Sequence, residues 1–75
     1  MVGDIEKQIE FLKRYFDGLK KSVSEARKRG KDTRLAELRM MNIPHKIKYL
    51  EVSKSAEDIK KLKILLAKLE KEIPK

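Results

Sequence analysis

The chain has 75 residues, no cysteine and a formal net charge of +8, and 43% of its residues are charged. This length suits one small domain, residues 1–75, and the lack of cysteine excludes disulfides and thiolate metal sites. Pairing with another copy or with a partner is therefore the most economical source of extra stability. The positive charge favours anionic partners such as nucleic acid, acidic lipid or acidic protein surfaces, without choosing among them.

The first predicted element is a long helix that begins near Asp4, its expected cap, and ends near Arg29. Gly30 is expected to close this helix in the left-handed conformation. Along the helix, apolar residues recur in alternate steps of four and three, a period of about 3.5 that marks a narrow seam on one side. Such a seam is buried only when another helix lies along it. Its members are Ile5, Ile9, Leu12, Phe16, Leu19, Val23 and Ala26.

Between residues 33 and 52 the sequence predicts one or two short helices. Asp32 or Thr33 can cap the first, which should end before Pro44 because a proline pushes the preceding residue away from helical geometry. Residues 44–52 fit either a helix or a strand, and the helix is favoured because a lone strand has no ladder partner within one small domain. The apolar residues at helical spacing in the first short helix are Leu35, Leu38 and Met41.

The last predicted helix covers about residues 55–73, with Ser55 and Asp58 approximating a capping box at its start and Pro74 closing it. It carries a second seam of the same period, formed by Ile59, Leu62, Leu66, Leu69 and Ile73. The two seams can pack antiparallel within one chain or combine across a dimer. The sequence therefore predicts an all-α fold, a small helical bundle whose long N-terminal helix and C-terminal helix carry heptad-like seams. We expect it to be oligomeric, with a homodimer favoured.

Most of the net positive charge falls within residues 20–54. Each contact between such a cation and a phosphate would release counterions and strengthen binding at low salt. The alternative is a solvated surface, since cations are also favoured at the C-terminal end of a helix by its dipole. The residues that we consider for polyanion binding are Lys20, Lys21, Arg27, Lys28, Arg29, Lys31, Arg34, Lys46 and Lys48.

The segment from Thr33 to Val52 has the outline of a helix-turn-helix. A short helix with Ala36 precedes a break at Asn42, and a second helix opens at Pro44. The turn lacks the usual glycine, so two short helices that cap a bundle are the alternative. In the helix-turn-helix interpretation, the side chains presented to a nucleic-acid groove are His45, Lys46, Lys48 and Tyr49.

No motif predicts catalysis, and we expect no enzyme, no cofactor and no catalytic, cofactor-binding or metal-binding residues. His45 is the only histidine, the serines have no neighbouring base, and no glycine-rich loop is present. The longest apolar run, residues 64–67, falls far short of the roughly 20 residues that span a bilayer. The start resembles no secretory signal, so a cytoplasmic location is expected, and the lysine-rich and glutamate-rich composition with few amides is thermophile-like.

The sequence thus predicts a non-enzymatic helical association or scaffold module that forms a homo-oligomer through coiled-coil-like seams. The alternative is a dimeric basic nucleic-acid-binding protein whose helix-turn-helix-like middle segment contacts the phosphate backbone. The identity of any partner, and whether the seams pair within or between chains, stay open at this point.

Overall fold

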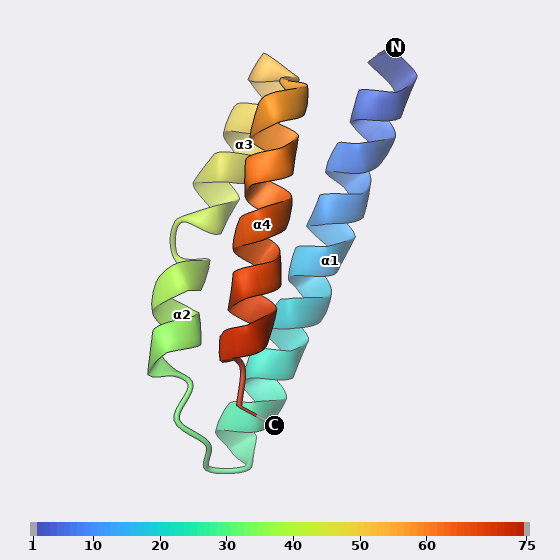
Figure 1. The fold of residues 1–75 in the computed structure, drawn as a ribbon. Helices are drawn as coiled ribbons and strands as arrows, with labels where there is room; N and C mark the ends of the chain where they lie inside the picture. Colours follow the sequence, from blue (N-terminus) through green and yellow to red (C-terminus); the bar gives the residue numbers. More distant parts are fainter. Residues whose placement is uncertain (1, 75) are drawn as a thin grey trace.

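The structure is a computed structural model that describes residues 2–74. Within these residues the chain forms four helices: α1 (Val2–Lys28), α2 (Arg34–Met40), α3 (Ile43–Ser53) and α4 (Ala56–Glu72). They form a rod of 44 × 16 × 16 Å. Figure 1 shows α2 and α3 following one another along one side of α4, while α1 lies on the other side. The predicted all-α fold is therefore confirmed.

The end of α1 shows how local sequence fixes a boundary. Gly30 has a φ of 81°, and its N–H donates to the carbonyl of Arg27 while the N–H of Lys31 donates to that of Ala26. This is a Schellman closure, which only glycine adopts without strain, so the predicted role of Gly30 is confirmed. The predicted cap at Asp4 is wrong, because α1 begins at Val2 and Asp4 lies in its first turn.

The two short helices form a single broken arm, which we call the middle arm (α2 and α3). Pro44 lies in the first turn of α3, where its missing N–H costs no helical hydrogen bond, and residues 44–52 are helical as predicted. Lys54 then adopts a left-handed conformation (φ 49°) that ends α3. Ser55 caps α4 as predicted, its hydroxyl oxygen accepting from the Asp58 N–H at 3.4 Å.

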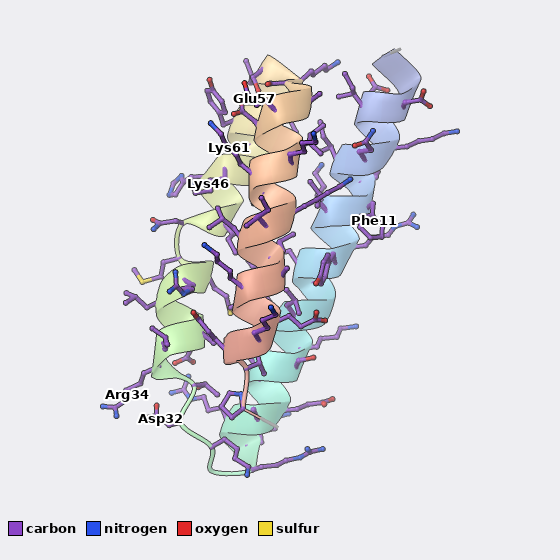
Figure 2. The ribbon with its side chains drawn as sticks, in the orientation of Figure 1. Phe11, Asp32, Arg34, Lys46, Glu57 and Lys61 are labelled. Carbon is purple, nitrogen blue, oxygen red and sulfur yellow. The ribbon has the colours of Figure 1, made fainter. Side chains whose placement is uncertain are left out.

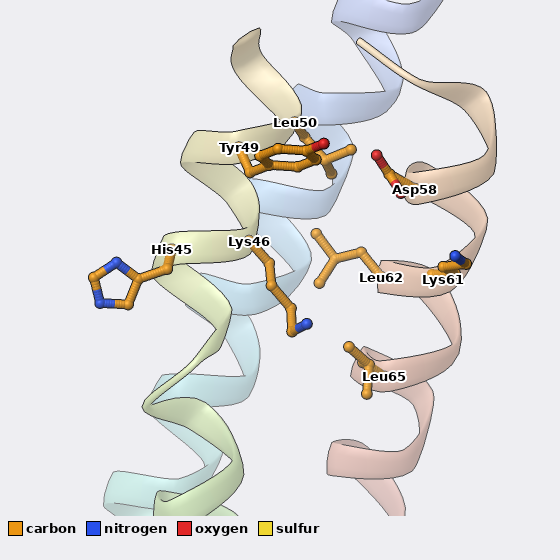
Figure 3. A pocket seen from close by; sticks show the side chains of 8 residues that line it. All are labelled: His45, Lys46, Tyr49, Leu50, Asp58, Lys61, Leu62 and Leu65. Carbon is orange, nitrogen blue, oxygen red and sulfur yellow. The ribbon is translucent and has the colours of Figure 1, made fainter. Parts of the chain in front are cut away.

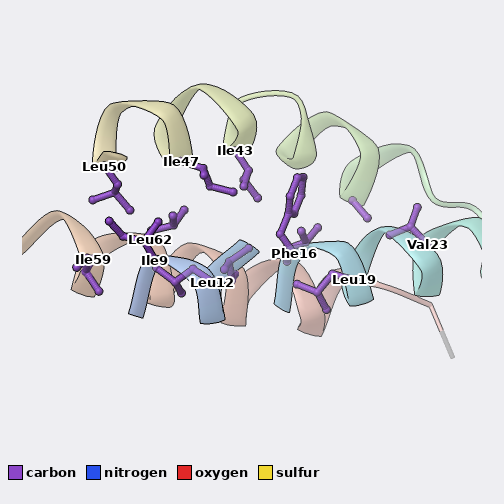
Figure 4. Close-up of a cluster of buried hydrophobic side chains, with 13 residues drawn as sticks. Ile9, Leu12, Phe16, Leu19, Val23, Ile43, Ile47, Leu50, Ile59 and Leu62 are labelled. Atoms are coloured by element: carbon purple, nitrogen blue, oxygen red, sulfur yellow. The ribbon is translucent and has the colours of Figure 1, made fainter. Parts of the chain in front are cut away.

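Both seams are buried inside one chain. Leu12, Leu66 and Leu69 are 0% exposed, and only the outermost members, Ile5 and Ile73, are partly exposed. The middle arm completes the core through Ala36, Ile43, Ile47 and Leu50, which Figure 4 shows in part facing the side chains of α1 and α4. Because each seam is covered by the other and by the middle arm, no second copy is needed to bury either seam. The homodimer therefore stays a prediction, but burial of the seams is no longer a reason for it.

The antiparallel packing of the seams is contradicted. Figure 1 shows α1 and α4 running in the same direction, with the middle arm carrying the chain back between them. The contacts agree, because Tyr15 of α1 donates a hydrogen bond to Glu70, and the residues that follow on α1 meet the end of α4 around Ile73. The physical reason is the middle arm itself, which is long enough to return the chain to the first end of the rod before α4 begins.

Candidate interaction surface

The large apolar side chains that remain in water gather on the middle arm. Leu35 and Leu38 of α2 are 54% and 62% exposed, and Tyr49 of α3 is 62% exposed. Other exposed members of this arm are Met41 and Val52, whereas α1 and α4 contribute Phe11 and Ile64. Isolated apolar residues on a surface are ordinary, but adjoining ones mark sites of interaction.

Two adjoining hollows run between the middle arm and α4, and together we call them the lateral groove. One has a volume of about 390 Å³ and the other about 320 Å³, and they share Lys46 and Leu65. The larger is lined by His45, Lys46, Tyr49, Leu50, Asp58, Lys61, Leu62 and Leu65, shown in Figure 3. The smaller is lined by Leu35, Leu38, Arg39, Asn42, Ile43, Lys46 and Leu65.

Helical spacing explains why these residues meet. On α3 the buried positions are Ile43, Ile47 and Leu50, so Lys46 and Tyr49 project one step around the helix, beside α4. On α4, Lys61 and Leu65 flank the buried Leu62 in the same way. The floor of the groove is therefore the edge of the core, and its rim carries the exposed leucines and Tyr49.

The groove is cationic as well as apolar. Arg39 forms an ion pair with Glu72, but among the described residues neither Lys46 nor Lys61 forms one. Figure 3 shows Lys46 extending along the gap between α3 and α4, while the His45 imidazole points away from it. Asp58 is the one carboxylate among the described lining residues.

Polar contacts hold α1 to the rest of the rod on its other sides. The Tyr15 hydroxyl donates to Glu70 at 3.0 Å, and burial together with this hydrogen bond raises the pKa of Tyr15. Lys13 pairs with Glu51, and the pKa of Lys13 is raised mainly by that hydrogen bond. Two further pairs, Glu6 with Lys54 at 3.3 Å and Arg27 with Glu37 at 3.1 Å, join α1 to the middle arm or its end. The three ion pairs are exposed to solvent, which screens them, so each adds little to stability.

The nine residues considered for polyanion binding do not form one patch. Lys46 and Lys48 lie on α3, while the other seven lie near the opposite end of the rod, around the C-terminal part of α1 and the start of α2 (Figure 1). Of those seven, three have acidic partners: Lys20 with Asp17, Arg27 with Glu37 and Arg34 with Asp32. The exposed remainder is Lys21, Lys28, Arg29 and Lys31.

The Asp32 and Arg34 pair closes the loop before α2, and both residues are labelled in Figure 2. Arg34 donates to the Asp32 carboxylate from its guanidinium at 3.0 and 3.1 Å and from its backbone N–H at 3.1 Å. These hydrogen bonds lower the pKa of Asp32 to about 2, and the carboxylate in turn raises the pKa of Arg34. Thr33, buried at the cap position of α2, makes no capping hydrogen bond with its side chain.

The structure does not arrange the residues of the predicted helix-turn-helix as that motif requires. Helices of that motif cross at about 90–120°, whereas Figure 1 shows α2 and α3 extending along the same side of α4. His45, Lys46 and Tyr49 line the hollow beside α4, and Lys48 does not line it.

The sequence analysis missed the lysines of α4. Five exposed lysines on this helix form no ion pair among the described residues: Lys60, Lys61, Lys63, Lys68 and Lys71. The net charge of this segment conceals the lysines, because acidic residues at both ends of the helix cancel most of their charge. Two of those acids, Glu70 and Glu72, are engaged by other parts of the rod. The number of lysines between the two acidic ends would have been the better signal.

Two other kinds of site are a metal centre and a membrane-spanning helix. Within residues 2–74 no group of three or more His, Cys, Asp or Glu side chains is placed to hold a metal ion, and no helix there has the length and apolarity to cross a membrane.

Comparison with known proteins gives no relative. No protein-family model matches the chain, and neither the curated proteins nor the solved structures contain a match to it.

Proposed function

We propose that this protein is a non-enzymatic helical interaction module that binds a partner protein through the middle arm. The observation that carries the proposal is the contrast in burial: both seams are covered inside the rod, yet Leu35, Leu38 and Tyr49 stand in water around one groove. A core that is already closed gives these side chains no role in folding. Covering them would be favourable by about 25 cal/mol per Å².

A second copy is a poorer occupant of this surface than a different protein. In a symmetric dimer the same patch meets itself, so Lys46 and Lys61 of both copies would share one interface. Like charges at close range repel. Light scattering at high micromolar concentration therefore tests the homodimer directly, and we expect one chain per particle.

The interaction is tested by selecting binders from a displayed library of random peptides against the intact chain. We expect peptides whose affinity falls at least about tenfold for Leu38→Ser with Tyr49→Ser, because both side chains border the groove. Phe11→Ser with Ile64→Ser is the matched control, since these exposed apolar residues lie on α1 and α4 and do not line the groove. Circular dichroism confirms that each variant is folded. A selection that yields no peptide sensitive to the first pair contradicts the proposal.

Polyanion binding is the second candidate. It is favoured by the α4 lysines, which form no ion pair within the part of the chain that the structure describes, and by the exposed cations at the end of α1. A mobility-shift titration with duplex DNA should then show affinity that falls steeply with salt. Replacing Lys60, Lys63, Lys68 and Lys71 by glutamine, or reversing charge at Arg27, Arg29 and Lys31, separates the two basic regions. No shift at low salt removes this candidate.

A further inference from the structure

We infer that the lateral groove receives an amphipathic helix with acidic flanks. This inference rests on the proposed function and specifies its partner. Three properties of the groove carry it: its length, its apolar rim and two lysines, Lys46 and Lys61, that form no ion pair among the described residues.

The length of the groove matches a short helix. Along the middle arm the lining residues extend from Leu35 to Leu50, and along α4 they extend from Asp58 to Leu65. At 1.5 Å per helical residue, the lining residues cover about 22 Å along the middle arm, the length of a helix of about 15 residues, and about 10 Å along α4. An extended peptide would gain nothing from the backbone here, because helices offer no unpaired sheet edge for strand addition.

The rim supplies apolar contacts at helical intervals. Leu35 and Leu38 border one hollow, Tyr49 borders the other, and Leu65 lies at the point that both share. A partner helix that carries apolar residues at i, i+3 or i+4, and i+7 would place one side chain in each hollow and one between them.

The charge of the groove determines which charge the flanks of the partner helix should carry. Lys46 lines both hollows and Lys61 lines one, and neither forms an ion pair within the described chain. The whole chain carries +8, so an acidic ligand is also attracted from a distance. Phosphates would satisfy the lysines but leave the leucines of the rim in water, which favours a protein helix over nucleic acid.

The probes are three synthetic peptides of about 16 residues that share one leucine stripe and differ in their flanks, which are glutamate, glutamine or lysine. Each is titrated into the full ¹⁵N-labelled chain, and binding is followed by chemical-shift changes. We expect the glutamate peptide to bind most tightly and the lysine peptide least. The shifted amides should cluster around Lys46, Tyr49 and Leu65, and the affinity should fall with salt.

Paired variants test the lysines. Lys46→Gln with Lys61→Gln should weaken the glutamate peptide by roughly two- to thirtyfold, the range expected for two exposed ion pairs. Lys48→Gln with Lys60→Gln removes the same charge from the same two helices outside the groove, and should weaken binding less than about twofold.

Each other result overturns the inference in a distinguishable way. Equal binding of the glutamate and glutamine peptides refutes the acidic flank, and shifts that map to α1 refute the groove. Shifts that grow with protein concentration and no peptide identify a second copy as the occupant. Failure of all three peptides refutes a helical occupant, while the displayed-library selection still decides whether the middle arm binds proteins at all.

Discussion

The two paired helices, α1 and α4, bury more apolar side chains than the middle arm. The pair buries nearly the whole length of two apolar seams, whereas α2 buries a single residue, Ala36, and turns its leucines to water. Helices as short as α2 and α3, with 7 and 11 residues, fall below the roughly 12–15 residues that an isolated helix needs. The arm therefore depends on the pair for its structure, and it carries the surface that we propose binds a partner.

The largest expected effect on stability comes from comparing a buried leucine of the paired helices with an exposed leucine of the middle arm. Leu66→Ala removes a side chain that is 0% exposed and should lower the free energy of unfolding by about 3 kcal/mol. Leu38→Ala, the same change at an exposed site, should alter it by less than about 0.5 kcal/mol. Urea denaturation followed by circular dichroism measures both. Equal losses would show that the Leu38 side chain is as deeply packed as that of Leu66.

The glycine at the junction between the regions should matter more than the glycine inside the pair. Gly30→Ala forces a side chain into left-handed geometry and should destabilise by about 1–2 kcal/mol. Gly18→Ala lies within α1, where an added Cβ meets nothing within 4 Å, and should stabilise by about 1 kcal/mol. Thermal melts measure the two opposite shifts. A loss of stability for Gly18→Ala would point to a close neighbour that the packing does not show.

The caps of α4 and α2 give a smaller contrast. Ser55→Ala removes a capping hydrogen bond and should cost about 1 kcal/mol. Thr33→Val removes no capping hydrogen bond and keeps the buried volume, so it should cost less than half as much. Chemical denaturation of both variants under one condition makes the comparison. The reverse order would show that Thr33 holds α2 by a contact other than its cap.

The smallest effect concerns acid. Since the pKa of Asp32 is lowered from 3.8 to about 2 in the folded chain, its pairing with Arg34 adds stability above about pH 4 that is lost as the pH falls toward 2. Carbon-detected NMR of the carboxyl group should give a midpoint near 2. Arg34→Gln should return that midpoint toward 3.8 and leave the paired helices unchanged. An unaltered midpoint would assign the shift to another group.

The seams were predictable because burial on one side of a helix leaves a periodic trace in the sequence. Leu12, Leu19, Leu62 and Leu69 follow the period of about 3.5 and all are buried. The same is true of Gly30 and Ser55, whose roles depend on only a few neighbouring residues.

The relative direction of the seams and the lateral groove were not predictable in this way. Parallel and antiparallel seams have the same periodicity, so nothing near Leu12 or Leu62 distinguishes them. The groove joins Leu38 to Leu65, and their meeting depends on which side of α4 the middle arm packs against. The spacing of Leu35, Leu38 and Met41 equally fits an inward or an outward face, and the small side chain of Ala36 is the one that lies against the core.

The hydrogen bond from Tyr15 to Glu70 gives the molecule an internal reporter. The chain has two tyrosines and no tryptophan, and Tyr49 stands at the groove while Tyr15 bridges α1 and α4. Fluorinated tyrosine would therefore produce one resonance for the paired helices and one for the proposed binding surface. Occupancy of the groove and loosening of the rod could then be followed separately in a single spectrum.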